Sequence, residues 1–301
     1  MNEPRPPAGA PLASIALLTY NRCATVGRAL ATARAQDYPN LEILVLDNAS
    51  TDGTEALCRA AAAADGRIRY LRHPQNLGAI GNFNAALQEA AGRYFMWLAD
   101  DDWLTPNYVS ACVAVLERDP TVALAAGQAE FPDEPPATRR PRPIELRQTE
   151  TQARVLNYLW NPRDNSIFYG VYRHELVRAV GLKNILASDW LTVAAVASQG
   201  ALVTTPAATI FRSSGGISRS HRHAARALGL PTWHGLEPKI ATASSIAGYF
   251  RREYPFADLD GVARRRLAAR VFLVLAARKR ALRWLLWFVP RDQRPAAVSA
   301  A

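Results

Sequence analysis

The sequence contains few cysteines and no long hydrophobic run. Its three cysteines, Cys23, Cys58 and Cys112, lie far apart in 301 residues; this pattern suggests neither a disulfide framework nor a zinc site and fits a reducing compartment. No run approaches the roughly 18 apolar residues of a spanning helix. The first eleven residues hold four prolines and no apolar segment, which indicates a disordered start rather than a secretory signal. We therefore expect a cytoplasmic protein.

Negative charge is scarce at one end of the chain. The net charge is +10, and residues 251–294 supply +8 of it, with 12 Lys and Arg residues against four Asp and Glu residues. The remainder is close to neutral, which argues against a protein built around nucleic acid. The length of 301 residues allows one large or two small domains with a sizeable core.

Short apolar runs of strand length alternate with longer segments of helix length in the first half of the chain. This alternation predicts an α/β fold with a mostly parallel sheet and helices on both faces. We expect strands over 13–20, 41–47, 68–71, 94–98 and 122–125, and helices over 25–35, 55–64, 82–91 and 106–118. Thr54 is a candidate cap for the second of these helices, and Asp52 is a candidate for an Asx-turn on the backbone of Gly53 and Thr54.

The pattern weakens after residue 130. Residues 132–147 are rich in Pro and Arg and predict an exposed loop, and residues 212–223 predict a mobile basic loop. We expect helices over 151–160, 174–180, 189–198 and 237–289, and strands over 166–172 and 201–204.

Polar residues follow the predicted strands. Thr19–Asn21, Asp47, Asn76 and Asp100–Asp102 all stand directly after or close behind an apolar run. Ligands of such sheets bind beyond the carboxyl ends of the strands. Three adjacent carboxylates repel one another and are costly to bury, and a divalent cation with oxygen ligands would offset both costs. The alternative for Asp100–Asp102 is a solvated acidic turn.

Four motifs at these strand ends carry a resemblance to a known family. They are Thr19-Tyr20-Asn21, the segment 46–54 (LDNASTDGT), Asn76-Leu77-Gly78 with Asn82 behind it, and the segment 98–103 (LADDDW). In this order they resemble the inverting nucleotide-sugar glycosyltransferases of family 2, which have the GT-A fold. The resemblance covers roughly residues 13–220. It implies a Rossmann-like catalytic domain with a C-terminal helical extension.

The resemblance also implies domain boundaries. We expect a disordered N-terminus (1–12), a catalytic domain (13–225) with a nucleotide-sugar half (13–130) and an acceptor half (151–225), a basic amphipathic extension (237–290) and a tail (291–301).

The resemblance assigns roles to the strand-end residues. Asp47 would accept a hydrogen bond from the base; its alternative is a strand-end residue that caps the following loop. Asp101 would be the metal ligand, and Asp102 would be a second ligand or a cap of the helix after Pro106. The metal would be Mg²⁺ or Mn²⁺, which all-oxygen ligation suits. The residues implied to bind the nucleotide sugar are Thr19, Tyr20, Asn21, Asp47, Asn76, Gly78, Asn82, Asp100 and Arg212. Ala99 departs from the family, because many members have Asp there.

Asp189, in the segment Ser188-Asp189-Trp190, matches the family's catalytic base at the start of a helix. Such a base takes the proton of the acceptor hydroxyl; the alternative is a helix-terminal residue stabilised by the dipole. Trp190 is either a sugar-stacking residue or a core aromatic. Arg212, Arg219, His221, Arg222 and His223 belong to a loop that either closes over the diphosphate or is simply solvated. No Gln-x-x-Arg-Trp motif of the processive branch occurs, which favours addition of a single sugar.

The C-terminal basic segment interleaves arginines with apolar runs too short to span a bilayer. Trp, Leu and Arg together over 261–290 favour an interfacial helix on anionic lipid, which would make the protein peripheral on the inner face of the cell membrane. The alternative is a helix packed on the catalytic domain or on a second subunit.

The sequence thus predicts transfer of one sugar from a nucleotide diphosphate sugar, most simply a UDP-sugar, to a hydroxyl acceptor such as a lipid-linked saccharide of a bacterial surface polysaccharide. Two alternatives stay open. A metal-dependent nucleotidyltransferase would need a Gly-rich phosphate loop near residues 17–22, which is missing. A catalytically silent nucleotide-sugar-binding scaffold at the membrane would need neither Asp101 nor Asp189.

Overall fold

The computed structural model describes residues 9–134, 143–160, 165–213, 221–252 and 260–277, together with 285, 288 and 289. The chain divides into two compact units. The first comprises residues 1–143, 166–181 and 204–214, and the second comprises residues 144–165, 182–203 and 215–301. Residues 151–225, the expected acceptor half, contribute to both units.

The first unit is built on one large sheet with the strand order β3-β2-β1-β4-β8-β6-β9-β5. Its first four strands, β3 (Ile68–Arg72), β2 (Leu41–Asp47), β1 (Ala13–Thr19) and β4 (Tyr94–Ala99), pair in parallel. Their near-continuous apolar runs suit strands that are buried on both faces. The remaining strands are β5 (Trp103–Leu104), β6 (Val122–Glu130), β8 (Val171–Arg173) and β9 (Ala201–Phe211). Strand β8 pairs antiparallel with β4 and with β6, and β5 pairs antiparallel with β9.

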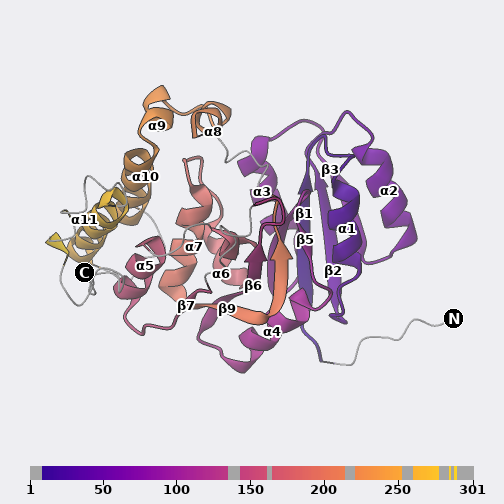
Figure 1. Cartoon of the computed structure of the whole chain (residues 1–301), viewed down its shortest axis with the longest axis horizontal. Helices are drawn as coiled ribbons and strands as arrows, with labels where there is room; N and C mark the ends of the chain where they lie inside the picture. The colour runs from indigo at the N-terminus through magenta and orange to yellow at the C-terminus, as the bar shows by residue number, and fades with distance from the viewer. Residues whose placement is uncertain are drawn as a thin grey trace. The chain divides into compact units, whose positions relative to one another are not determined.

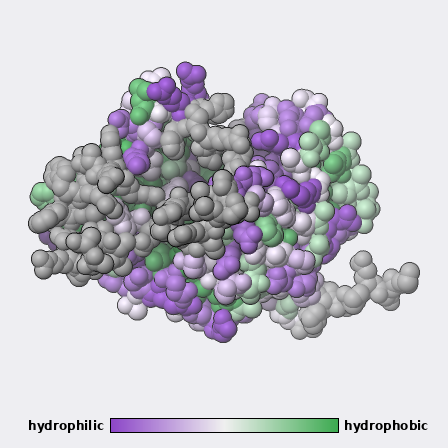
Figure 2. Space-filling model, viewed as in Figure 1, coloured by the Kyte–Doolittle hydropathy of each residue, from purple (hydrophilic) through white to green (hydrophobic). Residues whose placement is uncertain are grey.

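Helices cover both faces of the parallel strands, which confirms the predicted α/β fold class. The helices are α1 (Val26–Arg34), α2 (Thr54–Ala64), α3 (Gly78–Glu89), α4 (Tyr108–Arg118) and α6 (His174–Val180). Right-handed crossovers place α1 and α2 on one face, because both connections step the same way across the sheet, and α3 on the other; Figure 1 shows this arrangement. The outer surface of α2 appears pale to green in Figure 2, in keeping with its exposed alanines.

Aromatic side chains fill the core next to β4. The indole of Trp97 stacks on Phe168 at 4.7 Å between ring centroids and meets Phe95 edge-on at 4.9 Å. Its Nε1–H donates to the backbone oxygen of Phe83 in α3 at 3.2 Å. Packing of this kind, with the polar handle satisfied, fixes β4 and therefore the acidic residues that follow it.

The second unit is mainly helical. It contains β7 (Glu145–Leu146), which pairs with the first residues of β9, and the helices α5 (Thr151–Trp160), α7 (Ser188–Gln199), α8 (His221–Ala227), α9 (Thr232–Leu236), α10 (Pro238–Arg252) and α11 (Gly261–Ala277). The helix α10 packs along α11, which buries Leu267, Val271 and Leu275. Among the helices that the structure describes, none is long and apolar enough to cross a membrane.

Several local predictions are wrong. The predicted helix over 237–289 is interrupted, since Asp260 lies outside both α10 and α11, and the predicted loop over 212–223 runs into α8, which begins at His221. Thr54 does not cap α2: Gly53 holds the cap position, and Thr54 is the buried first residue of the helix. Helix α3 begins at Gly78 and not at residue 82. Residues 166–172 form the 3₁₀ turn η1 (Ser166–Tyr169) and the short β8. Between them lies Gly170, where an added Cβ would be 2.6 Å from the Ala125 backbone oxygen. Strand β9 extends to Phe211. Residues 135–142, within the predicted loop 132–147, lie outside the described residues, as do residues 1–8 of the N-terminus.

Candidate functional site

The loops after β1, β2 and β4 end at the same edge of the sheet. The parallel register sets Thr19 of β1 opposite Asp47 of β2, and Leu18 opposite Ala99 of β4. The predicted polar residues therefore lie just beyond the ends of neighbouring strands. This is the edge at which open α/β sheets bind ligands.

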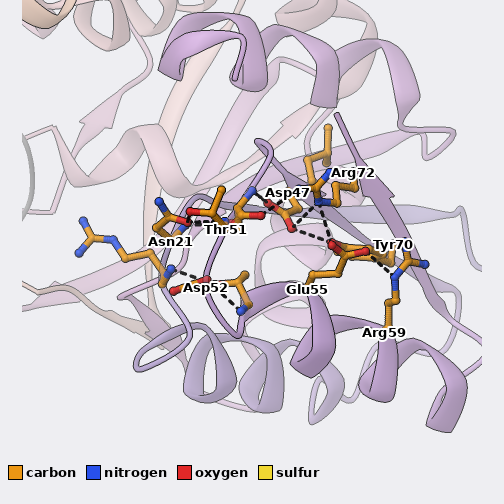
Figure 3. A network of polar contacts seen from close by, with 12 residues as sticks. Asn21, Asp47, Thr51, Asp52, Glu55, Arg59, Tyr70 and Arg72 are labelled. Atoms are coloured by element: carbon orange, nitrogen blue, oxygen red, sulfur yellow. Dashed lines mark hydrogen bonds and ion pairs between the residues drawn. The ribbon is translucent and has the colours of Figure 1, made fainter. Parts of the chain in front are cut away.

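The loops after β1 and β2 are bonded to each other. The backbone N–H of Asn21 donates to Ser50 Oγ at 2.9 Å, and the N–H of Thr51 donates to Asn21 Oδ1 at 2.7 Å. Asp52 accepts from the N–H of Thr54 at 2.9 Å and from the N–H of Cys23 at 3.2 Å, which confirms the Asx-turn (Figure 3). The Thr54 side chain, followed by these backbone N–H groups, lowers the pKa of Asp52. Tyr20 lies on this edge with 44% of its surface exposed.

Asp47 is fully buried, and both of its oxygens have partners. Oδ1 accepts from the N–H of Ser50 at 2.8 Å, and Oδ2 accepts from the hydroxyl of Tyr70 at 2.6 Å. The Arg72 guanidinium lies 3.9 Å from Oδ2. The loop-capping contact is the one expected if Asp47 is structural, and it also holds the carboxylate in one orientation. Burial, followed by the hydrogen bond to Asp47, raises the pKa of Tyr70.

Tyr70 and Arg72 belong to a closed polar ring that the sequence analysis missed. Arg72 pairs with Glu55 at 3.0 Å, Glu55 pairs with Arg59 at 2.8 Å, and the Arg59 guanidinium lies 5.0 Å from the Tyr70 ring centroid. Asp47 completes this closed set of contacts, because it lies between Tyr70 and Arg72 (Figure 3). Alternation along β3 is the signal that could have found it, because residues two apart in a strand share a face.

The loop after β3 is tied to the loop after β2 by Asn48, a residue of the 46–54 motif to which the sequence analysis assigned no role. Asn48 Nδ2 donates to Asn76 Oδ1 at 2.8 Å, and Asn48 Oδ1 accepts from the N–H of Leu77 at 2.8 Å. Gly78 follows with φ of 71°, a conformation that favours glycine. Asn82 is only 4% exposed, and its amide donates to the backbone oxygen of Leu46. The structure thus brings Asn76 and Gly78 to the strand-end loops and places Asn82 beneath them.

The three adjacent aspartates have different environments. Asp100 is 9% exposed, and burial raises its pKa to about 6, an effect opposed by the Thr19 hydroxyl and by Arg22. The Arg22 guanidinium lies 3.7 Å from Asp100 Oδ1. The carboxylate of Asp101 is partly exposed, and it has no hydrogen bond or ion pair among the residues that the structure describes. Its backbone oxygen accepts from Arg28, whose guanidinium stacks 3.5 Å from the centroid of the Trp103 ring.

Asp102 is bound to Arg212 at the end of β9. Arg212 Nε lies 3.2 Å from Asp102 Oδ2, and the N–H of Ser213 donates to Oδ1 at 3.0 Å. Burial raises the pKa of Asp102, although the Arg212 charge opposes the effect. Asp102 therefore does not cap α4, whose cap position is held by Asn107; that alternative is wrong. Arg212 also donates to Ser166 Oγ at 3.1 Å.

The acidic residues fit a divalent cation as a partial ligand set. Asp101 supplies an available carboxylate, and a nearby cation would offset the repulsion that helps to raise the pKa of Asp100. No group of three His, Cys, Asp or Glu side chains that could hold a metal occurs within the described ranges. The remaining ligands would therefore be phosphate and water oxygens, as is usual for Mg²⁺.

Asp189 lies in the second unit, in the first turn of α7. Its Oδ2 accepts from the side-chain amide of Asn165 at 2.9 Å, and Asn165 Oδ1 accepts in turn from the hydroxyl of Tyr158. This relay was missed, because Asn165 and Tyr158 stand in segments without a recognisable motif. The ring of Trp190 lies 5.7 Å from that of Tyr158. The helix N-terminus favours the ionised form of a carboxylate in this position.

Among the described non-glycine residues, a positive φ occurs at three positions, in the loops after β1 and β2 and in the turn before α7. Asn21, Ala49 and Ala187 have φ of 52°, 66° and 61°. Each stands directly beside a candidate residue or its loop, and strain of this kind gathers at functional sites. Residues Gly215, Gly216 and Arg219 of the predicted basic loop lie outside the described residues, as do the side chains of His221 and His223.

Comparison with known proteins identifies a family and related sequences. The family model described as "Glycosyl transferase family 2" matches residues 14–181. The putative colanic acid biosynthesis glycosyl transferase WcaA of Escherichia coli (strain K12) is 30% identical over 165 residues, which cover 55% of this chain and 59% of that protein. The chain covers 59%, 15% and 38% of the first three curated relatives, less than two-thirds of each.

Two solved structures show the same fold. The structure of S. aureus TarS 1–349 in complex with UDP-GlcNAc has a TM-score of 0.62 at 15% identity and covers 93% of this chain and 77% of that chain. The mannosyltransferase PcManGT from Pyrobaculum calidifontis, in complex with GDP-Man and Mn²⁺, has a TM-score of 0.57 at 20% identity and covers 99% and 77%. At these identities the likeness concerns the fold alone.

Proposed function

The chain belongs to glycosyl transferase family 2, and we propose that it transfers a single sugar from a nucleotide diphosphate sugar to a hydroxyl acceptor with inversion. A UDP-sugar is the simplest donor, and the structural likeness to a protein that binds UDP-GlcNAc supports it. The similarity to a protein named for colanic acid biosynthesis supports an acceptor in a surface polysaccharide, which lipid-linked saccharides would supply.

One observation carries this proposal: the strand-end loops of β1, β2 and β4 converge, with Asp47 held rigidly and Asp101 left available. In the proposed complex, Thr19, Tyr20 and Asn21 lie against the base and ribose, and Asp47 orients the base. Asn76 and Gly78 line the nucleotide through the loop after β3. Asn82 acts from below by holding the end of β2.

A divalent cation, Mg²⁺ or Mn²⁺, would neutralise the diphosphate charge as the bond to the sugar breaks. Asp101 would bind it directly, and Asp100 would bind it through water or face the ribose. Asp102 is the weaker ligand in this assignment, because Arg212 and Ser213 already occupy its oxygens. The structural likeness to a mannosyltransferase bound to Mn²⁺ supports the choice of metal.

Asp189 would be the catalytic base. Its carboxylate would take the proton of the acceptor hydroxyl while that oxygen attacks the anomeric carbon from the face opposite the departing diphosphate. Asn165 orients the carboxylate through its hydrogen bond, in the way that a third group orients the base of a hydrolase. Arg212 and Arg22 supply positive charge near the acidic residues, which would favour the leaving group.

A thermal-shift screen of nucleotide sugars with and without Mn²⁺ tests the donor, because a ligand that binds the native state raises the melting temperature. Transfer or donor hydrolysis by the wild type, lost in Asp101→Ala and Asp189→Ala, separates an enzyme from a silent scaffold. Release of free nucleoside diphosphate distinguishes sugar transfer from nucleotidyl transfer, which would release pyrophosphate. Full turnover in Asp189→Ala would refute the base assignment.

A further inference from the structure

The helical pair α10 and α11 carries a basic hollow in the second unit. Arg251 lines it from the last turn of α10, and Gly261, Arg264 and Arg265 line it from the start of α11. The Arg265 side chain turns back toward Gly261, where an added Cβ would lie 3.9 Å from Nη2. No acidic residue lines the described part of the hollow.

The two arginines at the start of α11 face an unfavourable helix dipole. Arg264 and Arg265 lie in the first turns of α11, where the helix dipole is positive and disfavours cations. Asp260 directly precedes the helix, and its carboxylate accepts from the N–H groups of Val262 and Ala263 at 2.7 Å each and is attracted by the charges of Arg266 and Arg264. These bonds lower the pKa of Asp260. An anion in the hollow would face both the guanidinium groups and the helix terminus.

Arg264 gives a second, independent indication. Its Nε is buried and has no hydrogen-bond partner within the described part of the chain. A buried donor without an acceptor is costly, and such groups in native proteins usually mark an unseen water, ion or ligand. The guanidinium fork fits phosphate oxygens in a bidentate manner, which an ammonium group does not.

We propose that this hollow binds a phosphate group, carried by an anionic lipid headgroup or free in solution. Arg251 and Arg265 would flank the phosphate, and Arg264 would donate to it from below. Val262 is 51% exposed beside the hollow, and an apolar side chain there suits the boundary between headgroups and acyl chains. The site belongs to the second unit and does not depend on the proposed sugar transfer. The sequence analysis expected residues 261–290 to contact anionic lipid, and the proposed site assigns part of that contact to the start of α11. Residues 278–284, 286, 287 and 290 of this segment lie outside the described residues.

Arg264→Ala tests the hollow, and Arg266→Ala is the matched control. Arg266 is exposed on the same helix, does not line the hollow and carries the same charge. Sedimentation with vesicles of phosphatidylglycerol and phosphatidylcholine, and of phosphatidylcholine alone, measures headgroup binding by the full-length protein. Calorimetric titration with inorganic phosphate at constant ionic strength measures binding of the free ion. Arg264→Lys keeps the charge but loses the fork.

Loss of one positive charge near an anionic surface weakens vesicle binding about fivefold, and we expect no more than this for Arg266→Ala. Arg264→Ala should lose about tenfold beyond that, because it also loses charge-assisted hydrogen bonds. Arg264→Lys should fall between the two. Binding of vesicles alone would identify a headgroup, and binding of inorganic phosphate would identify the free ion. Equal losses in Arg264→Ala and Arg266→Ala, or no binding of either probe by the wild type, would overturn the proposal.

Discussion

The pair formed by Asp102 and Arg212 allows a quantitative test of how the acidic segment is held. The side chain of Asp102 is 2% exposed and that of Arg212 is 19% exposed. Arg212→Ala removes the guanidinium and leaves a buried carboxylate without its counter-charge. Such a group either stays ionised at a high cost or takes up a proton, whichever is cheaper. We expect Asp102 to take up the proton.

The proton uptake sets an upper limit on the part of the destabilisation that comes from the buried charge of Asp102. An aspartate in the unfolded chain has a pKa of about 3.9, and each pH unit above it costs about 1.36 kcal/mol if the folded state must hold the proton. The limit is therefore about 4 kcal/mol at pH 7 and about 1.5 kcal/mol at pH 5. Wild-type Asp102 already has a raised pKa, so the part of the deficit due to its charge should lie below these limits. Loss of the Arg212 hydrogen bond to Ser166 adds a part that does not depend on the titration of Asp102. The folded state of the variant binds the extra proton, and the deficit must shrink as the pH falls.

Urea denaturation at pH 7 and pH 5, in buffer with EDTA, measures the deficit of Arg212→Ala against the wild type. The double variant Asp102→Asn/Arg212→Met should be within about 1 kcal/mol of the wild type, because both charges leave together. Addition of Mn²⁺ checks the alternative in which Asp102 is a metal ligand. The reasoning fails if the deficit is the same at both pH values, or if Mn²⁺ stabilises Arg212→Ala more than it stabilises the wild type.

Three further predictions follow from the remaining polar contacts. Asn165→Ala should lower kcat about tenfold or more with little change in KM for the donor, because it removes the hydrogen bond that orients the carboxylate of Asp189. Steady-state kinetics with the wild type as control measures this, and a change in KM alone would contradict it. Tyr70→Phe should destabilise the protein by about 1–3 kcal/mol, since it leaves one oxygen of buried Asp47 without its donor; a change below about 0.5 kcal/mol in urea denaturation would count against that contact. Hydrogen bonds from Arg67 lower the pKa of Asp65, so the stabilising effect of the Asp65 carboxylate is present above about pH 4 and is lost as the pH falls further. Asp65→Asn should therefore weaken the fall of the melting temperature in acid. An unchanged acid dependence in thermal melts would exclude this role of Asp65.

The sequence located the strand-end edge because strand and helix periods, and the polar residues that interrupt them, are local signals. It could not assign partners, because these depend on contacts between distant residues. Arg212 reaches Asp102 across 110 positions, and Asn165 reaches Asp189 across 24. Tyr70 and Arg72 carried no motif, and only the parallel register of β2 and β3 brings them to Asp47. Thr54 failed as a cap because its hydroxyl accepts from the N–H of Arg22 and is buried.

The three consecutive aspartates are separated by their partners, and this separation explains how the sheet tolerates them. Two of the carboxylates are buried, and each has an arginine within 4 Å: Arg22 beside Asp100 and Arg212 beside Asp102. Asp101 is less buried and keeps its oxygens available in the described part of the chain. A segment that used all three carboxylates on one cation would draw Asp100 and Asp102 away from those two arginines and bring a second positive charge near them. In the proposed cation complex, this arrangement would favour Asp101 as the one direct protein ligand, while Asp100 and Asp102 hold the loop through their arginines.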